Sequence, residues 1–188
     1  MHPTIYQHTL TRHPVSIAEW YDALSNCYDE LYGREQAGKH EKVFGLVGPR
    51  QFDLVVDIGC GTGLLLQRMK GTYSRAIGID LSNGMLSRAR KKAGSSDIDF
   101  IRADCSALPI RNDIASCAFC ISTMEANTEP EKDLSELARM VKRGGILLFT
   151  LFHDEGAVPD IGSNGVSGIE EPLRITSRET LYLARQQV

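Results

Sequence analysis

Three glycines and an aspartate stand together in the segment Asp57-Ile58-Gly59-Cys60-Gly61-Thr62-Gly63. Glycine lets the chain turn sharply and brings bare backbone close to a ligand. Two further carboxylates, Asp80 and Asp104, end the next two apolar runs. In open α/β sheets ligands bind at the carboxyl ends of the strands, where a carboxylate can accept both hydroxyls of a ribose. The pattern predicts a nucleoside site, with Asp80 on the ribose and Asp104 on the exocyclic amine of an adenine.

The spacing of the glycines argues against a dinucleotide. A dinucleotide fingerprint requires G-x-G-x-x-G, whereas here the third glycine, Gly63, comes one residue early. Asp57 would also lie close to a bound pyrophosphate and repel it. The same carboxylate suits a cofactor that carries an amino group and no phosphate. A P-loop is excluded because no Gly-Lys-Ser/Thr follows the glycines.

A parallel sheet would bring these residues together. Short apolar runs predict five strands, at 54–58, 75–80, 98–105, 114–122 and 146–152. Helical segments between them indicate βαβ units with right-handed crossovers and a sheet covered on both faces. Helices are expected at 63–70, after the cap Ser82, and after Pro130. Gly144-Gly145 are expected to end the last helix, with Lys142-Arg143 at its negative end.

Two amphipathic helices are expected before the sheet. Ser16 and Glu19 have the spacing of a capping box, and an apolar stripe continues to Leu31. Gly33 is expected to stop this first helix, and the second is expected over residues 36–46.

The length of 188 residues fits one domain with a single core. The expected fold class is α/β, with a doubly wound, mostly parallel sheet and an antiparallel C-terminal hairpin formed by 172–176 and 180–184. The expected parts are a flexible N-terminus (1–15), a helical lid (16–48), a cofactor-binding core (53–152), a flexible glycine-rich loop (153–168) and C-terminal strands (169–188).

Composition narrows the class of protein. The formal net charge is -3, so there is no basic excess to indicate a nucleic-acid partner. Five cysteines, an odd number, argue against a disulfide framework. Cys117 and Cys120 lie on a predicted strand and point to opposite faces, so they cannot chelate a metal, and no metal is expected. No segment approaches the ~18 apolar residues of a membrane span. We expect a cytoplasmic protein with reduced thiols.

Four segments in order resemble the motifs of class I S-adenosylmethionine-dependent methyltransferases. Residues 55–63 resemble motif I, 77–82 the next motif, 100–109 the third-strand motif, and 141–147 the turn before the fifth strand. Each motif alone is common, but the four at family spacing are jointly specific. The likeness runs from about residue 18 to 152 and is nearest to the ubiquinone/menaquinone-type, or "methyltransferase 11", branch. It implies a Rossmann-like methyltransferase fold and an enzyme that converts S-adenosylmethionine to S-adenosylhomocysteine.

The resemblance also implies roles for individual residues. The backbone of residues 59–63 would wrap the methionine part of the cofactor, Asp80 would hold the ribose, and Leu81 would pack on the adenine. Asp104 and Cys105 would bind the edge of the adenine. The N-terminal helix matches the family's lid, whose tyrosines either close over the sulfonium or pack in the core. The predicted cofactor-binding residues are Tyr21, Tyr28, Asp57, Gly59, Cys60, Gly61, Gly63, Asp80, Leu81, Asp104, Cys105 and Ser122.

The sequence does not identify the methyl acceptor. Transfer from a sulfonium is an in-line displacement, so alignment and exclusion of water suffice without a dedicated nucleophile. A base is needed only if the acceptor loses a proton. Glu125 and His153 are candidates for this base. Glu125 is also explained as a solvated helix cap, and His153 as an exposed histidine of a loop. The Asn-Pro-Pro-Tyr signature of amino-group methyltransferases is missing, and a small-molecule acceptor is favoured. Arsenite, held by Cys60, Cys105 and Cys120, is a weaker alternative than simple packing of these thiols.

Family members usually carry substantial insertions where this chain has the glycine-rich loop. The acceptor pocket is therefore expected to be open or to be completed by a partner, either an activator protein or a second copy in a homodimer. Two other functions stay open: a cofactor-binding partner subunit without transfer activity, and an RNA or protein methyltransferase that needs an activator. A nicotinamide oxidoreductase is disfavoured by Asp57 and Gly63.

Overall fold

The computed structural model describes residues 16–94, 97–125, 130–154, 166, 168–170 and 172–186. The predicted flexible N-terminus, and residues 155–165 and 167 of the predicted flexible loop, lie outside these ranges.

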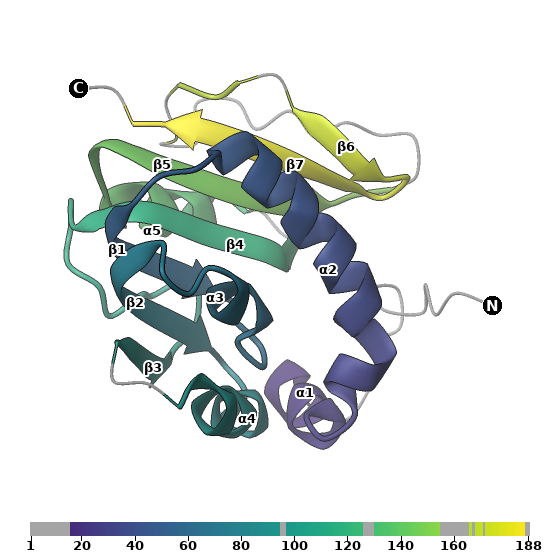
Figure 1. Ribbon diagram of the computed structural model, residues 1–188. Helices are drawn as coiled ribbons and strands as arrows, with labels where there is room; N and C mark the ends of the chain where they lie inside the picture. The colour runs from purple at the N-terminus through teal and green to yellow at the C-terminus, as the bar shows by residue number, and fades with distance from the viewer. Residues whose placement is uncertain are drawn as a thin grey trace.

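Seven strands form one sheet in the order β3-β2-β1-β4-β5-β7-β6 (Figure 1). β1 to β5 are parallel to one another, and β7 is antiparallel to both β5 and β6. The strands are β1 (Phe52–Ile58), β2 (Tyr73–Asp80), β3 (Ile98–Arg102), β4 (Ala115–Glu125), β5 (Val141–Phe152), β6 (Leu173–Thr176) and β7 (Glu179–Arg185). This confirms the predicted α/β fold with its antiparallel C-terminal hairpin. The chain changes direction across the sheet between β1 and β4, which is the switch point where ligands bind in such folds.

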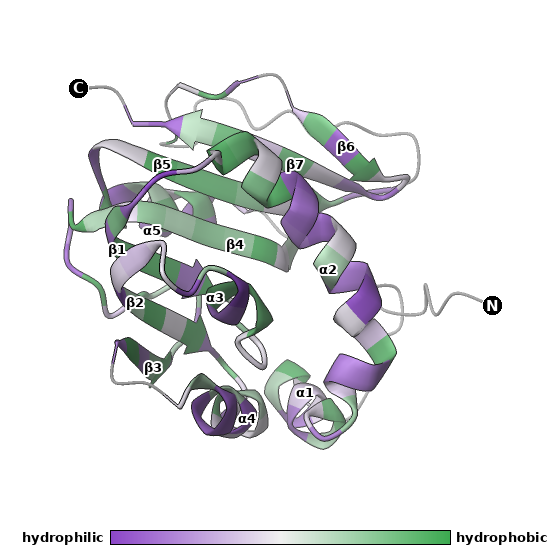
Figure 2. Ribbon diagram, in the orientation of Figure 1, coloured by the Kyte–Doolittle hydropathy of each residue, from purple (hydrophilic) through white to green (hydrophobic). Residues whose placement is uncertain are grey.

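The sheet separates two apolar cores, which explains why its central strands are continuous apolar runs. On one face, Val43 and Val47 of α2 and Leu65 of α3 pack with β1 and β4 residues. On the other face, α5 contributes Leu134 and Leu137. Figure 2 shows the central strands as the hydrophobic interior between these helices. The helices are α1 (Ile17–Leu24), α2 (Tyr28–Val47), α3 (Leu64–Arg68), α4 (Asn83–Ala93) and α5 (Glu131–Met140).

The cysteines follow the sequence-based expectation. Cys117 and Cys120 belong to opposite cores, as expected for residues three apart on a strand. All five cysteines of the chain are free thiols.

The N-terminal helices are divided differently from the prediction. α1 ends at Leu24, and α2 runs unbroken through Gly33, so the expected stop at Gly33 is wrong. A Cβ at Gly33 would meet nothing within 4 Å, so this glycine lies on an open helix surface. Its cost of about 1 kcal/mol relative to alanine is small beside the packing of a 20-residue helix. The chain turns instead at residues 25–27.

The end of α5 was also predicted wrongly. The helix ends at Met140, and residues 142–145 belong to β5. Ala115 pairs with Val141, but Cys117 pairs with Ile146, so the extra residues of β5 bulge out of the ladder. Gly144 has a φ of 74°, and a Cβ on Gly145 would lie 2.7 Å from the carbonyl oxygen of Lys142. The glycine pair therefore permits a bulge rather than a helix end.

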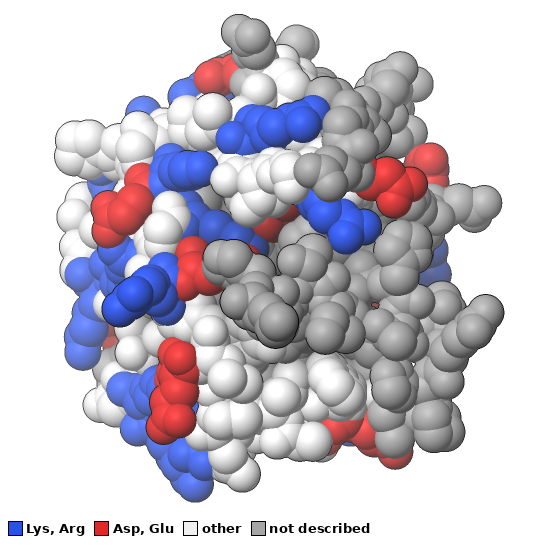
Figure 3. Space-filling model, turned by 90° about the vertical axis from the view of Figure 1, so that its right-hand side faces the viewer, with Lys and Arg blue, Asp and Glu red and all other residues white. Residues whose placement is uncertain are grey.

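The surface carries charges of both signs. On the face drawn in Figure 3, lysines and arginines are interspersed with aspartates and glutamates over the described residues. Ion pairs such as Arg68–Glu41 and Lys92–Asp29 join opposite charges. This pattern agrees with the lack of a basic excess in the composition. Among the described helices, none has the length and apolar character needed to cross a membrane.

Candidate functional site

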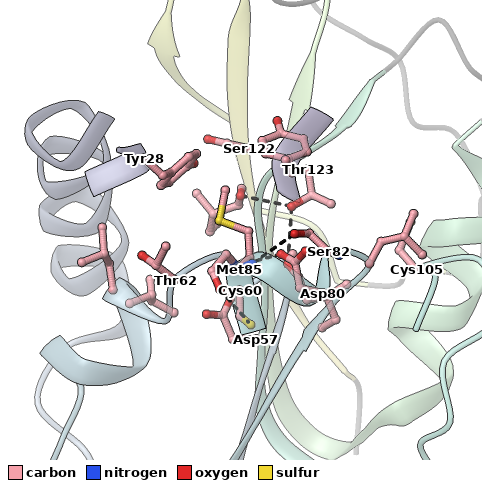
Figure 4. A pocket seen from close by; sticks show the side chains of 18 of the residues that line it. Tyr28, Asp57, Cys60, Thr62, Asp80, Ser82, Met85, Cys105, Ser122 and Thr123 are labelled. Atoms are coloured by element: carbon pink, nitrogen blue, oxygen red, sulfur yellow. Dashed lines mark hydrogen bonds between the residues drawn. The ribbon is translucent and has the colours of Figure 1, made fainter. Parts of the chain in front are cut away.

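A pocket lies where the carboxyl ends of β1 to β4 meet α1 and α2 (Figure 4). Most of the predicted cofactor-binding residues line it. These are Tyr21, Tyr28, Asp57, Gly59, Cys60, Gly61, Asp80, Leu81, Asp104, Cys105 and Ser122. The fold therefore brings together residues that lie on separate elements and are as far apart in the sequence as Tyr21 and Ser122.

The glycine turn after β1 forms the floor of the pocket. Gly59, Gly61 and Gly63 have φ values of 69°, 53° and 79°, in the left-handed region that favours glycine. A Cβ on Gly59 would lie 2.0 Å from Oγ1 of Thr123, so β4 leaves no room for a side chain there. Gly63 is not among the residues that line the pocket. It caps α3 and packs against Ala89, so its contribution is to the turn rather than to direct contact.

Asp57 places a buried carboxylate at the end of β1. The residue is 4% exposed, and Oδ2 is buried without a hydrogen-bond partner among the described residues. Burial, and then the charge of Asp80, raises the pKa of this carboxyl well above its usual value. A buried polar atom without a partner is costly, so this oxygen calls for a ligand that donates a hydrogen bond.

Asp80 is held by backbone amides at the end of β2. Its Oδ2 accepts from the amide of Gly61 at 2.8 Å, and its Oδ1 accepts from the amide of Ser82 at 2.8 Å. Each carboxylate oxygen has a second lone pair, which leaves room for two further donors. Burial raises the pKa of Asp80, and these hydrogen bonds partly oppose the rise.

The end of β3 carries a second acidic position. Oδ1 of Asp104 accepts from the amide of Ser106 at 2.9 Å, and hydrogen bonds from Ser106 lower the pKa of the carboxyl. Beside it, burial raises the pKa of Cys105 to about 12, so this residue is a thiol rather than a thiolate. Cys120, the third cysteine of the arsenite alternative, is fully buried in the core and is not among the pocket residues, as simple packing of this thiol predicts.

Two tyrosines of α1 and α2 cover the pocket. The rings of Tyr21 and Tyr28 lie 6.4 Å apart, and the Tyr28 ring lies 4.0 Å from the Cβ position of Gly61. Burial raises the pKa of Tyr28 above its usual value. Tyr28 thus stands over the glycine turn, and Tyr21 lines the pocket beside it.

Side chains that were not singled out from the sequence fasten these helices to the sheet. The carboxylate of Asp22 in α1 accepts from the hydroxyl of Ser82 and, at 2.7 Å, from the amide of Gly84. Asp29 of α2 accepts from the hydroxyl of Thr62 at 2.5 Å. Aspartates on helices are ordinary surface residues, so the sequence carried no signal for these contacts.

The β4 side of the pocket, defined here as Gln36, His40, Ile121, Ser122 and Thr123, contains polar groups from distant parts of the chain. The hydroxyl of Ser122 accepts from Nζ of Lys39 at 2.8 Å and donates to Oε1 of Glu179 at 2.9 Å. Its backbone has a φ of 58°, a conformation that costs a non-glycine residue about 1–3 kcal/mol. The strained residue is thus Ser122, whose hydroxyl forms hydrogen bonds with both Lys39 and Glu179.

Lys39 and Glu179 form a buried ion pair behind Ser122. Nζ of Lys39 lies 2.7 Å from Oε2 of Glu179 and 3.0 Å from Oε1 of Glu35. Lys39 is 5% exposed and Glu179 is fully buried. The pair links the middle of α2 to β7.

His40 lines the pocket one residue further along α2, and Gln36 lines it one turn earlier. His40 is 4% exposed, and its Nδ1 has no hydrogen-bond partner in the part of the chain that the structure describes. Burial, and then the charges of Arg68 and Lys39, lower the pKa of His40 to about 4, so the ring is neutral at physiological pH. Sequence analysis missed both residues because a polar residue in an amphipathic helix normally faces solvent.

Of the two predicted catalytic candidates, only the side chain of His153 is described. His153 is not exposed; it is 5% accessible and is not among the residues that line the pocket. Its Nδ1 lies 2.8 Å from the carbonyl oxygen of Asp154 and its Nε2 lies 2.9 Å from the hydroxyl of Thr180. With both ring nitrogens engaged, His153 serves the packing of β5 against β7. Glu125 is the last residue of β4, and its side chain lies outside the described part, so its role stays a prediction.

A family model described as "Methyltransferase domain" matches residues 56–149. Among curated proteins, the chain is similar to a demethylmenaquinone methyltransferase of Clavibacter sepedonicus, with 26% identity over 76% of this chain and 60% of that protein. It is also similar to a malonyl-[acyl-carrier protein] O-methyltransferase of Anoxybacillus flavithermus, with 27% identity over 79% of this chain and 58% of that protein. The chain thus spans less than two thirds of the length of these relatives.

Among solved structures, the fold resembles that of one chain in the complex between the Trm112 methyltransferase activator and a methyltransferase of Haloferax volcanii. The TM-score is 0.72 at 19% sequence identity, over 92% of this chain and 98% of that chain. At this identity the likeness concerns the fold alone.

Proposed function

We propose that this chain transfers a methyl group to a small-molecule acceptor by in-line displacement. The chain belongs to the class I S-adenosylmethionine-dependent methyltransferases, in their ubiquinone/menaquinone-type branch. S-Adenosylmethionine, when bound, supplies a methyl group activated on a sulfonium, and S-adenosylhomocysteine is the product. The names of the two relatives, which refer to a quinone and to a malonyl group, support an acceptor outside nucleic acids.

The single observation that carries the proposal is the unpartnered Oδ2 of Asp57 beside the glycine turn. The cofactor's methionine part carries an ammonium group, which would supply the missing donor. A phosphate at the same place would meet a buried carboxylate and be repelled. The residues present therefore fit S-adenosylmethionine better than a dinucleotide.

The same geometry supports the residue assignments that we propose. Asp57 and the bare backbone of Gly59 to Gly61 would hold the methionine part, and Asp80 would accept both ribose hydroxyls on its free lone pairs. Leu81, Asp104 and Cys105 would surround the adenine. Tyr21, Tyr28 and Ser122 would enclose the reacting centre and exclude water, which strengthens every electrostatic contact inside.

The first test is isothermal titration with S-adenosylmethionine and S-adenosylhomocysteine. We expect micromolar binding that Asp80→Ala weakens about 100-fold or more, because two hydrogen bonds to a charged group are lost. Asp99→Ala is the matched control, since Asp99 is exposed and pairs with Arg75 outside the pocket. Tight binding of a nicotinamide dinucleotide instead would overturn the proposal.

A transfer assay with labelled donor separates the remaining alternatives. Labelling of small molecules in a cell extract by the isolated chain supports the proposed function. Binding of S-adenosylhomocysteine without any transfer would favour a cofactor-binding partner subunit. Labelling of RNA or protein that appears only after a second protein is added, or only when the chain is dimeric, would favour dependence on an activator. The activator complex of similar fold motivates that last arm.

A further inference from the structure

The pocket has two sides because of the strand order. β2 and β3 lie on one side of β1, and β4 lies on the other. The proposed nucleoside contacts of Asp80 and Asp104 lie at the β2 and β3 ends, so the β4 side is left for the group that receives the methyl. α2 leads from one side to the other: Tyr28 stands over Gly61, and Lys39 reaches Ser122 and Glu179.

In the described part of the chain, the β4 side offers no free positive charge. Among the described residues that line the pocket there is no lysine or arginine. The nearby ammonium of Lys39 faces the carboxylates of both Glu179 and Glu35, so its charge is more than balanced. Outside the described ranges, only the segment 1–15 contains an arginine or lysine, namely Arg12. An anionic acceptor would therefore lose its hydration without gaining a cation from the described part of the protein.

His40 provides a neutral alternative at the same place. Its imidazole is buried against the pocket, and no described residue forms a hydrogen bond with its Nδ1. A neutral imidazole has one donor and one acceptor, and a hydroxyl or N–H group satisfies the acceptor. Gln36, one helical turn away, adds an amide with both functions.

We infer that the β4 side of the pocket selects an uncharged acceptor bearing a hydroxyl or N–H group bound by His40, and discriminates against a carboxylate or phosphate. This inference rests on the proposed function and names its class of substrate. Lys39 and Glu179 act as positioning residues that hold Ser122 and keep their own charges inside the protein.

The test measures binding rather than turnover. 1-Naphthol and 1-naphthoate share a ring system and differ in the hydroxyl and the carboxylate. Titrated into the full chain saturated with S-adenosylhomocysteine, 1-naphthol should bind about tenfold or more tightly than 1-naphthoate. His40→Phe keeps an aromatic ring but removes the hydrogen bond, and should weaken 1-naphthol about fivefold while leaving S-adenosylhomocysteine affinity unchanged.

A charge variant tests the other half of the inference. Glu35→Gln removes one of the two carboxylates that pair with Lys39. The side chain of Glu35 is 51% exposed, so the fold should tolerate the substitution. We expect the affinity for 1-naphthoate to rise about twofold to fivefold, because the three charges of Lys39, Glu35 and Glu179 then no longer sum to a negative value. Equal affinity for the two probes, no binding of either, or an unchanged preference in His40→Phe would overturn the inference. Failure to bind S-adenosylhomocysteine would instead overturn the proposed function.

Discussion

The two sides of the pocket are built by different kinds of contact. At the ends of β2 and β3, backbone amides hold the carboxylates of Asp80 and Asp104. The donors lie two residues further along the chain, except for the Gly61 amide, which is 19 residues before Asp80. On the β4 side, Ser122 is held by Lys39, 83 residues earlier, and by Glu179, 57 residues later. Backbone donors are indifferent to side-chain identity, whereas the β4 side depends on particular side chains. The proposed cofactor contacts can therefore stay constant while the proposed acceptor side changes, which would let one fold serve many substrates.

The largest expected effect breaks the side-chain network. Lys39→Met leaves Glu179 buried without its cation, so the free energy of unfolding should fall by about 3–5 kcal/mol. Lys142→Met, whose partner Asp53 is exposed, is the matched control and should cost under about 1 kcal/mol. Urea denaturation of both variants measures the difference. A Lys39→Met/Glu179→Leu double variant should recover most of the loss, and failure to recover would contradict this account of the pair.

A smaller effect is expected where the backbone carries the site. Gly59→Ala would drive a Cβ into Thr123 from a left-handed conformation, and should cost about 3 kcal/mol and abolish S-adenosylhomocysteine binding. Gly71 has a φ of 89° but nothing within 4 Å of its Cβ position, so Gly71→Ala should cost only the backbone strain of about 1 kcal/mol. Thermal unfolding and titration of the two variants separate steric clash from strain. Equal losses would show that Thr123 does not close against the turn.

The smallest effect concerns the pH dependence set by Asp57. Because burial raises its pKa in the folded state, its contribution to stability is fully present below about pH 3.9 and is lost as the pH rises through the folded pKa. Asp57→Asn removes this loss, so the ligand-free variant should gain about 1 kcal/mol over wild type at pH 7.5 relative to pH 4.5.

The same substitution should weaken S-adenosylhomocysteine about tenfold to 100-fold, through loss of a charged hydrogen bond. Melting curves at the two pH values, read as differences from wild type, cancel the opposite slope that His40 contributes. A variant that is less stable at pH 7.5, or that binds as tightly as wild type, would contradict the role of Asp57.

The sequence by itself determined the order of the strands and helices, the glycine turn and the carboxylates at the strand ends. These features depend on hydrophobic period and on backbone conformation within a few residues, as the apolar run 54–58 and the segment 57–63 illustrate. Glycine was the least reliable signal: Gly33 lies within a helix and Gly144-Gly145 within a strand. One residue type serves helix ends, bulges and open surfaces, and only its neighbours in space distinguish them.

The tertiary structure alone decided the β4 side of the pocket. Lys39, His40 and Glu179 look like ordinary polar residues of a helix and a strand, and nothing in their local sequence marks them as buried. Their roles arise because α2 crosses the ends of β4 and β7, which brings opposite charges together and leaves the His40 ring facing the pocket. Which faces of distant elements meet depends on the packing of the whole chain, and the local pattern of hydrophobic residues does not encode it.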